Sequence, residues 1–288
     1  MYTVMGITGQ VGGAVAENLL ANGEHVRAVL RDASKAARWK ERGAEIAIAD
    51  FDDSAALEQA FRGVEGVFVM TPPNYAPEPG LPEVRSKIAV IRKALEAARP
   101  GKAVYLSSVG GEKASGLGLI TGSHLLEELS SLPIPGAFLR AGWFMENAQW
   151  DVASAREGTL HSYLQPLERA FPLVAAADIG RAAAEVLRQK WEGPRFIEVG
   201  APKRYSPNDL AEAFAKVLGH AVKPVVIPRE KWVETFVAQG TPADRTSYRV
   251  EMLDGFNSGW IDFGAPGAEH ITGTVELQDV IAALAAKA

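Results

Sequence analysis

The chain lacks cysteine altogether among its 288 residues. This absence excludes disulfide bonds, thiolate catalysis and metal sites with cysteine ligands, and it suits a reducing compartment. The N-terminal residues do not combine a basic segment with an apolar core, so we expect no signal peptide and a cytoplasmic location. Because no apolar run approaches the length of a bilayer-spanning helix, we expect no association with a membrane.

The chain also lacks any concentration of basic charge. Its 30 Lys and Arg residues and 35 Asp and Glu residues are interspersed and leave a net charge of −5, so we expect no nucleic-acid partner. The five histidines show no metal-ligand spacing and no G-x-S-x-G motif is present, which argues against a metal site and a hydrolase nucleophile. A hydrophobic content of 47% at this length predicts one large α/β domain or a domain with a smaller lobe.

One catalytic pair is missing as well. Ordinary short-chain dehydrogenases use a Tyr-x-x-x-Lys pair, whose side chains lie four residues apart on one helical face and supply a proton. The residues four positions after the six tyrosines are Gly6, Pro79, Val109, Leu167, Asp209 and Met252. None of them is lysine, so the sequence excludes the acid–base pair of that enzyme class.

The glycine-rich start of the chain is its most informative feature. A short strand at residues 2–5 precedes Gly6, Gly9 and Gly12 in the spacing G-x-x-G-x-x-G, and a run of helix formers follows. Glycines let the backbone approach a pyrophosphate, and a helix N-terminus favours its negative charge. We therefore predict a nucleotide site here, with a purely structural turn as the alternative. Its cofactor-binding residues are expected to be Gly6, Thr8, Gly9, Gln10, Val11 and Gly12.

Strand and helix patterns alternate through the first half of the chain. Strands are predicted at residues 25–30, 44–49, 64–70, 103–107 and 134–139, and helices at 33–42, 54–61 (with Ser54 as N-cap), 83–99 and 118–131. This rhythm predicts an α/β fold, a Rossmann-like doubly wound parallel sheet with right-handed crossovers.

The rhythm loosens in the second half. Helices are predicted at residues 178–190, from 206 onward, 228–238 and 275–286, and strands at 196–199 and 222–227. We therefore predict an NAD(P)-binding domain at residues 1–150 and a smaller substrate-binding C-terminal α/β lobe at residues 151–288, with some chain returning to the main sheet. The lobe is expected over the carboxyl ends of the strands, where ligands bind in such folds.

The end of the second strand bears on the choice of cofactor. An acidic residue at this point binds the ribose hydroxyls of NAD, whereas an arginine accommodates the 2′-phosphate of NADP. Arg31 and Lys35, with Ser34 and Arg38 nearby, are candidates for a phosphate site, whereas Asp32 would serve NAD. We favour NADP, with NAD possible and solvated turn residues as the structural alternative.

Two further strand ends supply candidate contacts. Asp50 and Phe51 are assigned to the adenine, although Asp50 capping a turn is nearly as good an explanation. Thr71 and Pro72 open a proline-rich loop after the fourth strand and are assigned to the cofactor, and Tyr75 of the same loop to the substrate. A rigid surface loop is the alternative, but long loops in compact domains are often functional.

Candidate catalytic groups are sparse. Ser107 and Ser108 end the fifth strand; we assign Ser107 to the cofactor site and Ser108 to catalysis. His124 titrates in the neutral range and is a candidate proton donor, with an exposed or packed histidine as the competing explanation.

Aromatic residues follow the sixth strand. Trp143, Phe144 and Asn147 leave the sheet at the cofactor end and are candidates to line a pocket for a flat apolar substrate, or to fill the core between the lobes.

Four segments resemble the NmrA-like family of atypical short-chain dehydrogenases. They are Gly6–Gly12, Val26–Arg31, Leu139–Asn147 and Asp178–Arg181. The resemblance implies a Rossmann domain that binds NAD(P), with pyrophosphate at the glycine turn and the 2′-phosphate at Arg31. Many relatives carry a lysine at the start of the helix before the sixth strand. This chain has Ser123-His124 there, so the resemblance does not extend to the lysine-assisted chemistry of those relatives.

The family resemblance implies two kinds of function. Some members reduce quinones with NADPH, and others bind NADP and regulate partner proteins. We expect an NAD(P)H-dependent oxidoreductase acting on a small molecule, a quinone or similar flat electrophile, by direct hydride transfer. The alternative is a redox sensor that binds a regulatory protein partner. A nucleotide-sugar epimerase is a third hypothesis, and the missing Tyr-x-x-x-Lys pair argues most strongly against it. A homodimer is possible.

Overall fold

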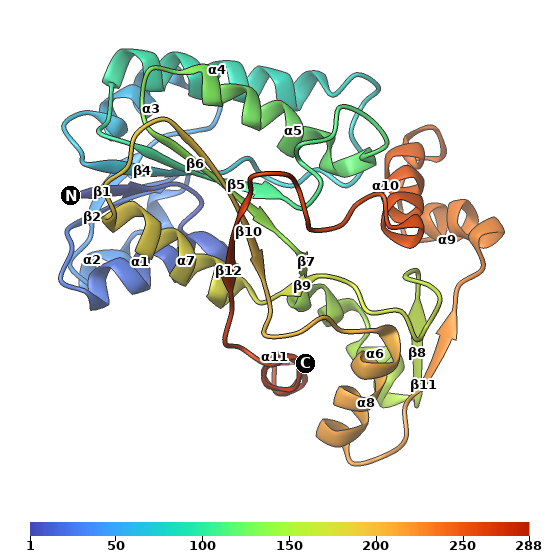
Figure 1. The fold of residues 1–288 in the computed structure, drawn as a ribbon. Helices are drawn as coiled ribbons and strands as arrows, with labels where there is room; N and C mark the ends of the chain where they lie inside the picture. Colours follow the sequence, from blue (N-terminus) through green and yellow to red (C-terminus); the bar gives the residue numbers. More distant parts are fainter. Residues whose placement is uncertain (288) are drawn as a thin grey trace.

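The computed structural model describes residues 1–287 and is built on one large sheet. Eight strands, all parallel, follow the order β12-β10-β6-β5-β4-β1-β2-β3 (Figure 1). Their bounds are β1 Tyr2–Val4, β2 Val26–Leu30, β3 Glu45–Ile48, β4 Gly66–Val69, β5 Ala103–Ser108, β6 Gly136–Ala141, β10 Pro194–Gly200 and β12 Glu269–Thr272. The central strands β1, β4 and β6 are buried along their whole length, because helices cover both faces. The predicted doubly wound α/β fold is confirmed.

Helices form a layer on each face of the sheet (Figure 1). One layer holds α1 (Gln10–Ala21), α2 (Ala37–Glu41) and α7 (Ala176–Arg188), and the other holds α3 (Ser54–Phe61), α4 (Pro82–Ala98) and α5 (Thr121–Glu127). A Cβ on Gly180 would come within 2.3 Å of the Cβ of Ala14, so this glycine lets α7 lie directly against α1. This close contact between the two helices explains why the Asp178–Arg181 segment has a glycine at position 180.

Asp178 of the same segment ties two distant parts of the chain together. Its carboxylate is 1% exposed and accepts hydrogen bonds at 2.9 Å from the backbone N–H groups of Thr274 and Val275. These residues form the turn between β12 and the last helix, α11 (Leu277–Ala285). The start of α7 therefore holds the C-terminal end of the chain against the sheet.

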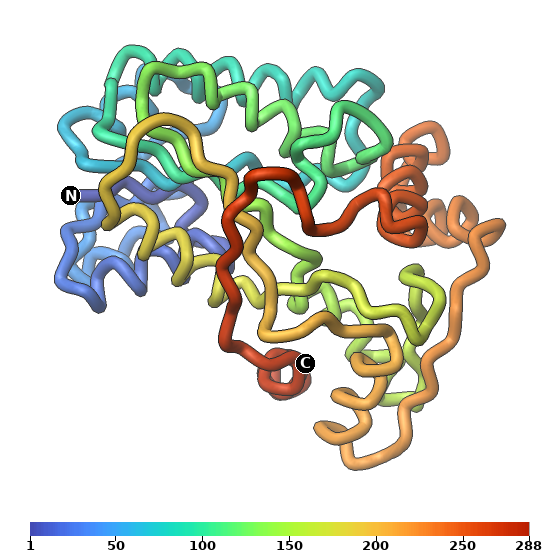
Figure 2. The backbone as a smooth tube through the Cα atoms, viewed as in Figure 1, coloured from blue at the N-terminus to red at the C-terminus, as the bar shows by residue number. Residues whose placement is uncertain are grey.

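The second half of the chain builds a smaller region beside the carboxyl ends of the strands (Figures 1 and 2). It contains β7 (Trp143–Phe144), α6 (Val152–Arg156), β8 (Thr159–Ser162), β9 (Leu173–Val174), α8 (Pro207–Leu218), β11 (Lys223–Val226), α9 (Trp232–Ala238) and α10 (Ser247–Ser258). Strands β10 and β12 and helix α7 return to the main sheet and its layer. The boundary at residue 150 stays a prediction. No helix in residues 1–287 has the length and apolar character needed to cross a bilayer.

Several local predictions are wrong. The N-cap of α3 is Asp53, whose carboxylate accepts the N–H groups of Ala55 and Ala56, and not Ser54. The helix predicted at residues 118–131 is broken into α5 between two 3₁₀ turns. The patterns also missed α10, which buries only Leu253, Gly255 and Phe256 and so shows little apolar periodicity.

Candidate functional site

The glycine turn has the geometry of an anion cradle. Gly6 has φ 63°, in the left-handed region, and a Cβ there would lie 2.8 Å from the Sδ of Met70. A Cβ on Gly12 would lie 2.4 Å from the carbonyl oxygen of Gly6, so only glycine lets α1 pack onto the turn. The N-cap of α1 is Gly9, which carries no side chain to cap the helix. The first-turn N–H groups are therefore free to bind a phosphate.

A cavity of about 180 Å³ lies beside this turn. It is enclosed by the carboxyl ends of β1, β2 and β4 and by the start of the proline-rich loop. The predicted cofactor residues on its wall are Gly6, Thr8, Gly9, Arg31, Phe51 and Pro72. The structure thus brings together residues that are far apart in the sequence, since Gly6 and Pro72 are separated by 66 positions.

At the end of β2 the side chain of Arg31 is exposed, whereas the carboxylate of Asp32 is engaged in a turn. Asp32 is the N-cap of a 3₁₀ turn and accepts the N–H of Ser34 at 2.9 Å, and hydrogen bonding from Ser34 holds the pKa of Asp32 below its usual range. Arg38 pairs with Glu17 at 2.8 Å. Arg31 is exposed at the cavity wall and forms no ion pair with any residue the structure describes. Arg31 is therefore an exposed cation on the cavity wall, and its contact with a 2′-phosphate stays a prediction.

Three other predicted cofactor residues lie at the edge of this region. Lys35 is exposed, and Thr71 is half-buried at the end of β4. The carboxylate of Asp50 is exposed and accepts no hydrogen bond within residues 1–287, since Asp53 caps α3 instead. Their contacts with a cofactor stay predictions.

Two residues at the start of α1 differ in what they can offer. Gln10 is exposed. Val11 is 6% exposed and packs into the main core, so only its backbone N–H is available to a phosphate.

Ser107 belongs to a buried polar network. Its hydroxyl donates to Oε1 of Glu127 at 2.7 Å, and Glu127 also accepts two hydrogen bonds from Arg140 at 2.9 and 2.7 Å. All three side chains are buried. The sequence patterns missed Glu127 and Arg140, although an arginine within the apolar strand 136–141 was a usable signal. The hydroxyl of Ser107 is committed to this network.

The two candidate catalytic residues lie near this network. Ser108 is half-buried on the opposite side of β5 from Ser107. Nδ1 of the half-buried His124 lies 2.8 Å from the carbonyl oxygen of Gly111, which favours the tautomer with a proton on Nδ1. Nε2 of His124 then carries a lone pair, and catalytic roles for both residues stay predictions.

An exposed aromatic pair joins the proline-rich loop to the segment after β6. The rings of Tyr75 and Trp150 meet edge to face, with centroids 5.9 Å apart, and the residues are 51% and 63% exposed. Trp150 ends the 3₁₀ segment η4 (Met145–Trp150) and was not among the predicted site residues. Exposed aromatic rings offer flat surfaces to a flat ligand.

The other predicted substrate residues are all half-buried. Trp143 packs edge to face on Phe256 at 5.2 Å in the core of the C-terminal region, and Phe144 packs against the main core. Asn147 is half-buried. Both explanations offered for these aromatics, pocket wall and core filling, remain compatible with the half-burial of Trp143 and Phe144.

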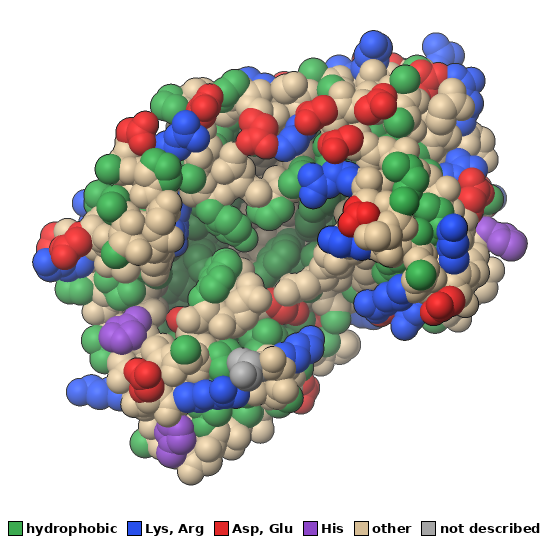
Figure 3. Space-filling view, turned by 180° about the vertical axis from the view of Figure 1, so that it is seen from behind, with side chains coloured by type: hydrophobic (Ala, Val, Ile, Leu, Met, Phe, Trp, Pro, Cys, Tyr) green, Lys and Arg blue, Asp and Glu red, His purple; other side chains and the backbone are tan. Residues whose placement is uncertain are grey.

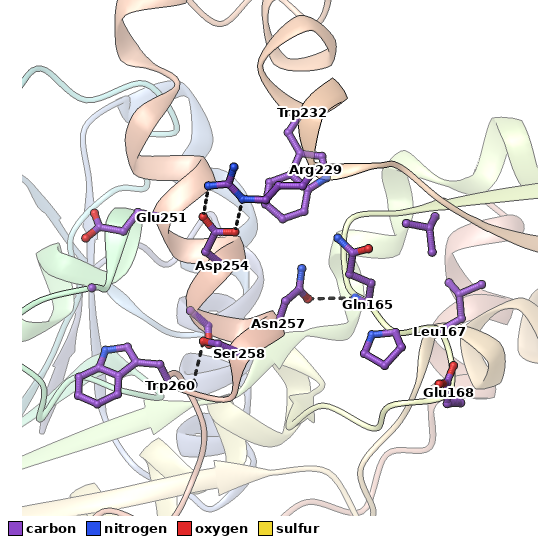
Figure 4. A pocket seen from close by; sticks show the side chains of 14 residues that line it. Gln165, Leu167, Glu168, Arg229, Trp232, Glu251, Asp254, Asn257, Ser258 and Trp260 are labelled. Atoms are coloured by element: carbon purple, nitrogen blue, oxygen red, sulfur yellow. Dashed lines mark hydrogen bonds and ion pairs between the residues drawn. The ribbon is translucent and has the colours of Figure 1, made fainter.

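The molecule is hollowed on the face opposite to that of Figure 1, and hydrophobic side chains gather in the hollow (Figure 3). A second and wider cavity, of about 920 Å³, lies between α10 and the loop at residues 165–168 (Figure 4). Arg229 and Asp254 pair across its wall at 2.6 Å. No predicted site residue lines this second cavity. No cluster of three or more potential metal ligands occurs in the described part of the chain.

Comparisons with known proteins agree with this geometry. The model of the NmrA-like family matches residues 2–255. The chain is 28% identical to an NAD(P)H azoreductase of Xenophilus azovorans, over 84% of this chain and 82% of that one. It is 27% identical to quinone oxidoreductase 2 of Escherichia coli, over 77% and 76% of the two chains.

Solved structures share the fold. An NADPH-dependent quinone oxidoreductase of Escherichia coli, solved with NADPH, superposes with a TM-score of 0.80 at 23% identity over 99% of both chains. A triphenylmethane reductase of Citrobacter sp. gives 0.79 at 20% identity over 99% of both. The predicted resemblance is confirmed: the chain belongs to the NmrA-like family.

Proposed function

We propose that this protein is an NADPH-dependent oxidoreductase that reduces a quinone or a similar flat electrophile, such as an azo compound. The observation that carries the proposal is the unpaired Arg31 beside the uncapped N-terminus of α1, on the wall of one cavity. The relatives matched over about three quarters of the chain or more are named as reductases of azo compounds and quinones, which supports the same chemistry. A purely regulatory role is not favoured by these relatives.

The residues present fit a dinucleotide. The glycine turn leaves room that a Cβ at Gly6 or Gly12 would fill, and the first turn of α1 supplies N–H donors for the pyrophosphate. Arg31 and Lys35 would hold the 2′-phosphate, with the adenine near Asp50 and Phe51. When bound, the nicotinamide supplies a hydride. The protein orients the two rings and excludes water between them.

The direct test is oxidation of NADPH in the presence of a panel of quinones and azo dyes. We expect turnover well above the rate without enzyme for at least one acceptor, and a lower KM for NADPH than for NADH. Absence of turnover over the whole panel, together with a measurable affinity for NADP, would instead favour the redox-sensor alternative. A cytoplasmic location and a homodimer stay predictions, to be tested by fractionation and by sedimentation.

Replacing Arg31 with alanine tests the choice of cofactor. Loss of one charge-assisted contact to the 2′-phosphate costs about 1.5–3 kcal/mol, so NADPH affinity should fall roughly 10- to 150-fold. NADH affinity should hardly change, because NADH has no 2′-phosphate. Titration by fluorescence measures both. Arg38→Ala is the matched control, since Arg38 already pairs with Glu17. Equal losses for both nucleotides in Arg31→Ala would contradict the assignment.

Replacing Trp150 with alanine tests the aromatic pair. The substrate would lose one aromatic face, worth about 1–2 kcal/mol, so its KM should rise roughly 5- to 30-fold while the KM for NADPH stays the same. Trp260→Ala is the matched control, because Trp260 is also half-exposed, at 50%, but lines the second cavity. An equal rise of the substrate KM in both variants would show that the aromatic pair is not part of the substrate site.

A further inference from the structure

The sulfur-containing side chains of this protein are all methionines. The sequence has five methionines and no cysteine. Met5 and Met145 are sealed in the interior, with 0% and 1% of their surface exposed. Met1, Met70 and Met252 are half-buried. An oxidant must reach a thioether in order to react with it, so exposure decides which methionines are oxidised first.

Met70 is the half-buried methionine that lies at the nucleotide cavity. It directly follows β4 and lines the cavity of about 180 Å³ beside the glycine turn. Its thioether also packs on that turn, because a Cβ added at Gly6 would lie 2.8 Å from Sδ and 3.0 Å from Cγ of Met70. Met5 contributes to the same wall but has no exposed surface. The Met70 sulfur therefore lies directly against the backbone that begins the predicted phosphate cradle.

The cavity wall around Met70 offers few partners to a polar atom. Most of its side chains are apolar, such as Val29 and Leu57. Its polar side chains are Thr8 and Arg31, and the first turn of α1 adds backbone N–H groups. These are the groups that the proposed function assigns to the cofactor. An extra acceptor oxygen on Met70 would therefore either stay without a donor or take a donor from a phosphate.

Oxidation of the thioether adds such an oxygen. A hydroperoxide transfers one oxygen atom to the sulfur: the O–O bond breaks, a sulfur–oxygen bond forms, and the rest of the peroxide leaves as water or an alcohol. The sulfur loses two electrons and the peroxide gains them. The product, methionine sulfoxide, is polar where the thioether was apolar, and methionine sulfoxide reductases can reverse the change.

We propose that Met70 is a redox-sensitive modification site, at which oxidation by a hydroperoxide weakens the binding of NADP(H) and bound NADP(H) protects the sulfur from oxidation. The inference rests on the nucleotide site of the proposed function and adds a means of regulating it. A nucleotide that fills the cavity covers the Met70 sulfur. If Met70 carries the sulfoxide, the nucleotide must displace water from its oxygen, and few donors replace that water.

The first test measures the oxidation of each methionine by hydrogen peroxide, with peptide mass spectrometry as the readout. In the unliganded protein, Met70 should be oxidised faster than the sealed Met5 and Met145. NADP⁺ carries the same phosphates as NADPH but no transferable hydride. At about 100 times its Kd it leaves roughly 1% of the sites free, so it should slow the oxidation of Met70 by up to ~100-fold. Met252 is the internal control, because it is half-buried on α10 and does not line this cavity.

The second test measures the affinity for NADP⁺ before and after peroxide treatment. An acceptor left without a donor opposes binding, so the Kd of the oxidised wild type should rise roughly 5- to 150-fold. Peroxide should leave the Kd of Met70→Leu at its own starting value, because leucine has no sulfur and a similar volume. Met252→Leu is the matched control and should respond to peroxide as the wild type does. Methionine sulfoxide reductases should restore the affinity of the oxidised wild type, which separates the sulfoxide from irreversible damage elsewhere.

The outcomes distinguish this inference from the proposed function. If NADP⁺ binds but does not slow the oxidation of Met70, or if peroxide treatment lowers the affinity of the wild type and of Met70→Leu equally or not at all, Met70 does not regulate the site and the reductase function stands. If the protein binds NADP⁺ and reduces no acceptor, the reductase function fails and the tests on Met70 still decide the inference. If neither NADP⁺ nor NADPH binds, both proposals fail.

Discussion

Replacing Gly12 with alanine is expected to weaken nucleotide binding by at least about 100-fold, since it displaces charge-assisted donors each worth roughly 1.5–3 kcal/mol. The added Cβ would lie 2.4 Å from the carbonyl oxygen of Gly6 and 2.7 Å from that of Met5. Both obstacles are backbone atoms and cannot rotate aside, so α1 must move away from the turn. The N–H groups of its first turn, which are the predicted phosphate donors, move with it.

The same substitution should also lower stability, by about 1–3 kcal/mol, as overpacking does in well-packed cores. Gly9→Ala is the graded control, because its Cβ would lie 3.3 Å from the Gly6 carbonyl oxygen and needs only a small shift. Calorimetric titration with NADPH and thermal unfolding measure the two effects. Gly12→Ala with normal affinity and normal Tm would show that α1 does not need this close approach.

Removing the Glu127 side chain with Glu127→Ala is expected to cost about 3 kcal/mol of unfolding free energy, the low end of the usual effect of breaking a buried ion pair, because Arg140 keeps a longer contact with Glu112 at 3.4 Å. Arg140 is 5% exposed, so water cannot replace the lost carboxylate. Burial alone lowers the pKa of Arg140, but hydrogen bonds and charge from Glu127, with the charges of Glu112 and Glu198, raise it above its ordinary value. Arg140 therefore stays charged, so the loss of the carboxylate cannot be offset by deprotonation of its guanidinium.

Urea unfolding monitored by circular dichroism measures this loss. Glu212→Ala is the matched control, because Glu212 pairs with Lys216 on the exposed surface of α8 at 2.7 Å, where such pairs are worth about 0.3–0.5 kcal/mol. Similar losses in the two variants would mean that the Ser107–Glu127–Arg140 network is not a major source of stability. A larger loss in Glu127→Ala, with unchanged NADPH affinity, would show that Ser107 serves the fold through this network.

Local patterns account for the nucleotide end of the molecule. The strand–turn–helix order and the glycine spacing act over about a dozen residues, so Gly6, Gly9 and Gly12 could be placed without a structure. The side chain at the end of β2 followed from strand alternation, which placed Arg31 at the cavity wall.

Other features depend on contacts between distant residues. Asp32 accepts the N–H of Ser34 and Arg38 pairs with Glu17, which leaves Arg31 and Lys35 as the cations of this turn that form no ion pair with a described residue. Neither contact could be read from the local pattern. The link between Glu127 and Arg140 required the packing of α5 against β5 and β6. Short elements such as β12, an edge strand, carry too little apolar periodicity to be recognised.

The sequence by itself determined the fold class, the family and the glycine turn, because each depends on neighbouring residues and on their spacing. It also determined what is absent, above all the Tyr-x-x-x-Lys pair. Only the tertiary structure decided which side chains meet: Tyr75 lies edge to face on Trp150, and the enclosed carboxylate of Asp151 pairs with no residue that the structure describes. The physical reason is that burial and the lack of a counter-charge are properties of surroundings assembled from several separate segments.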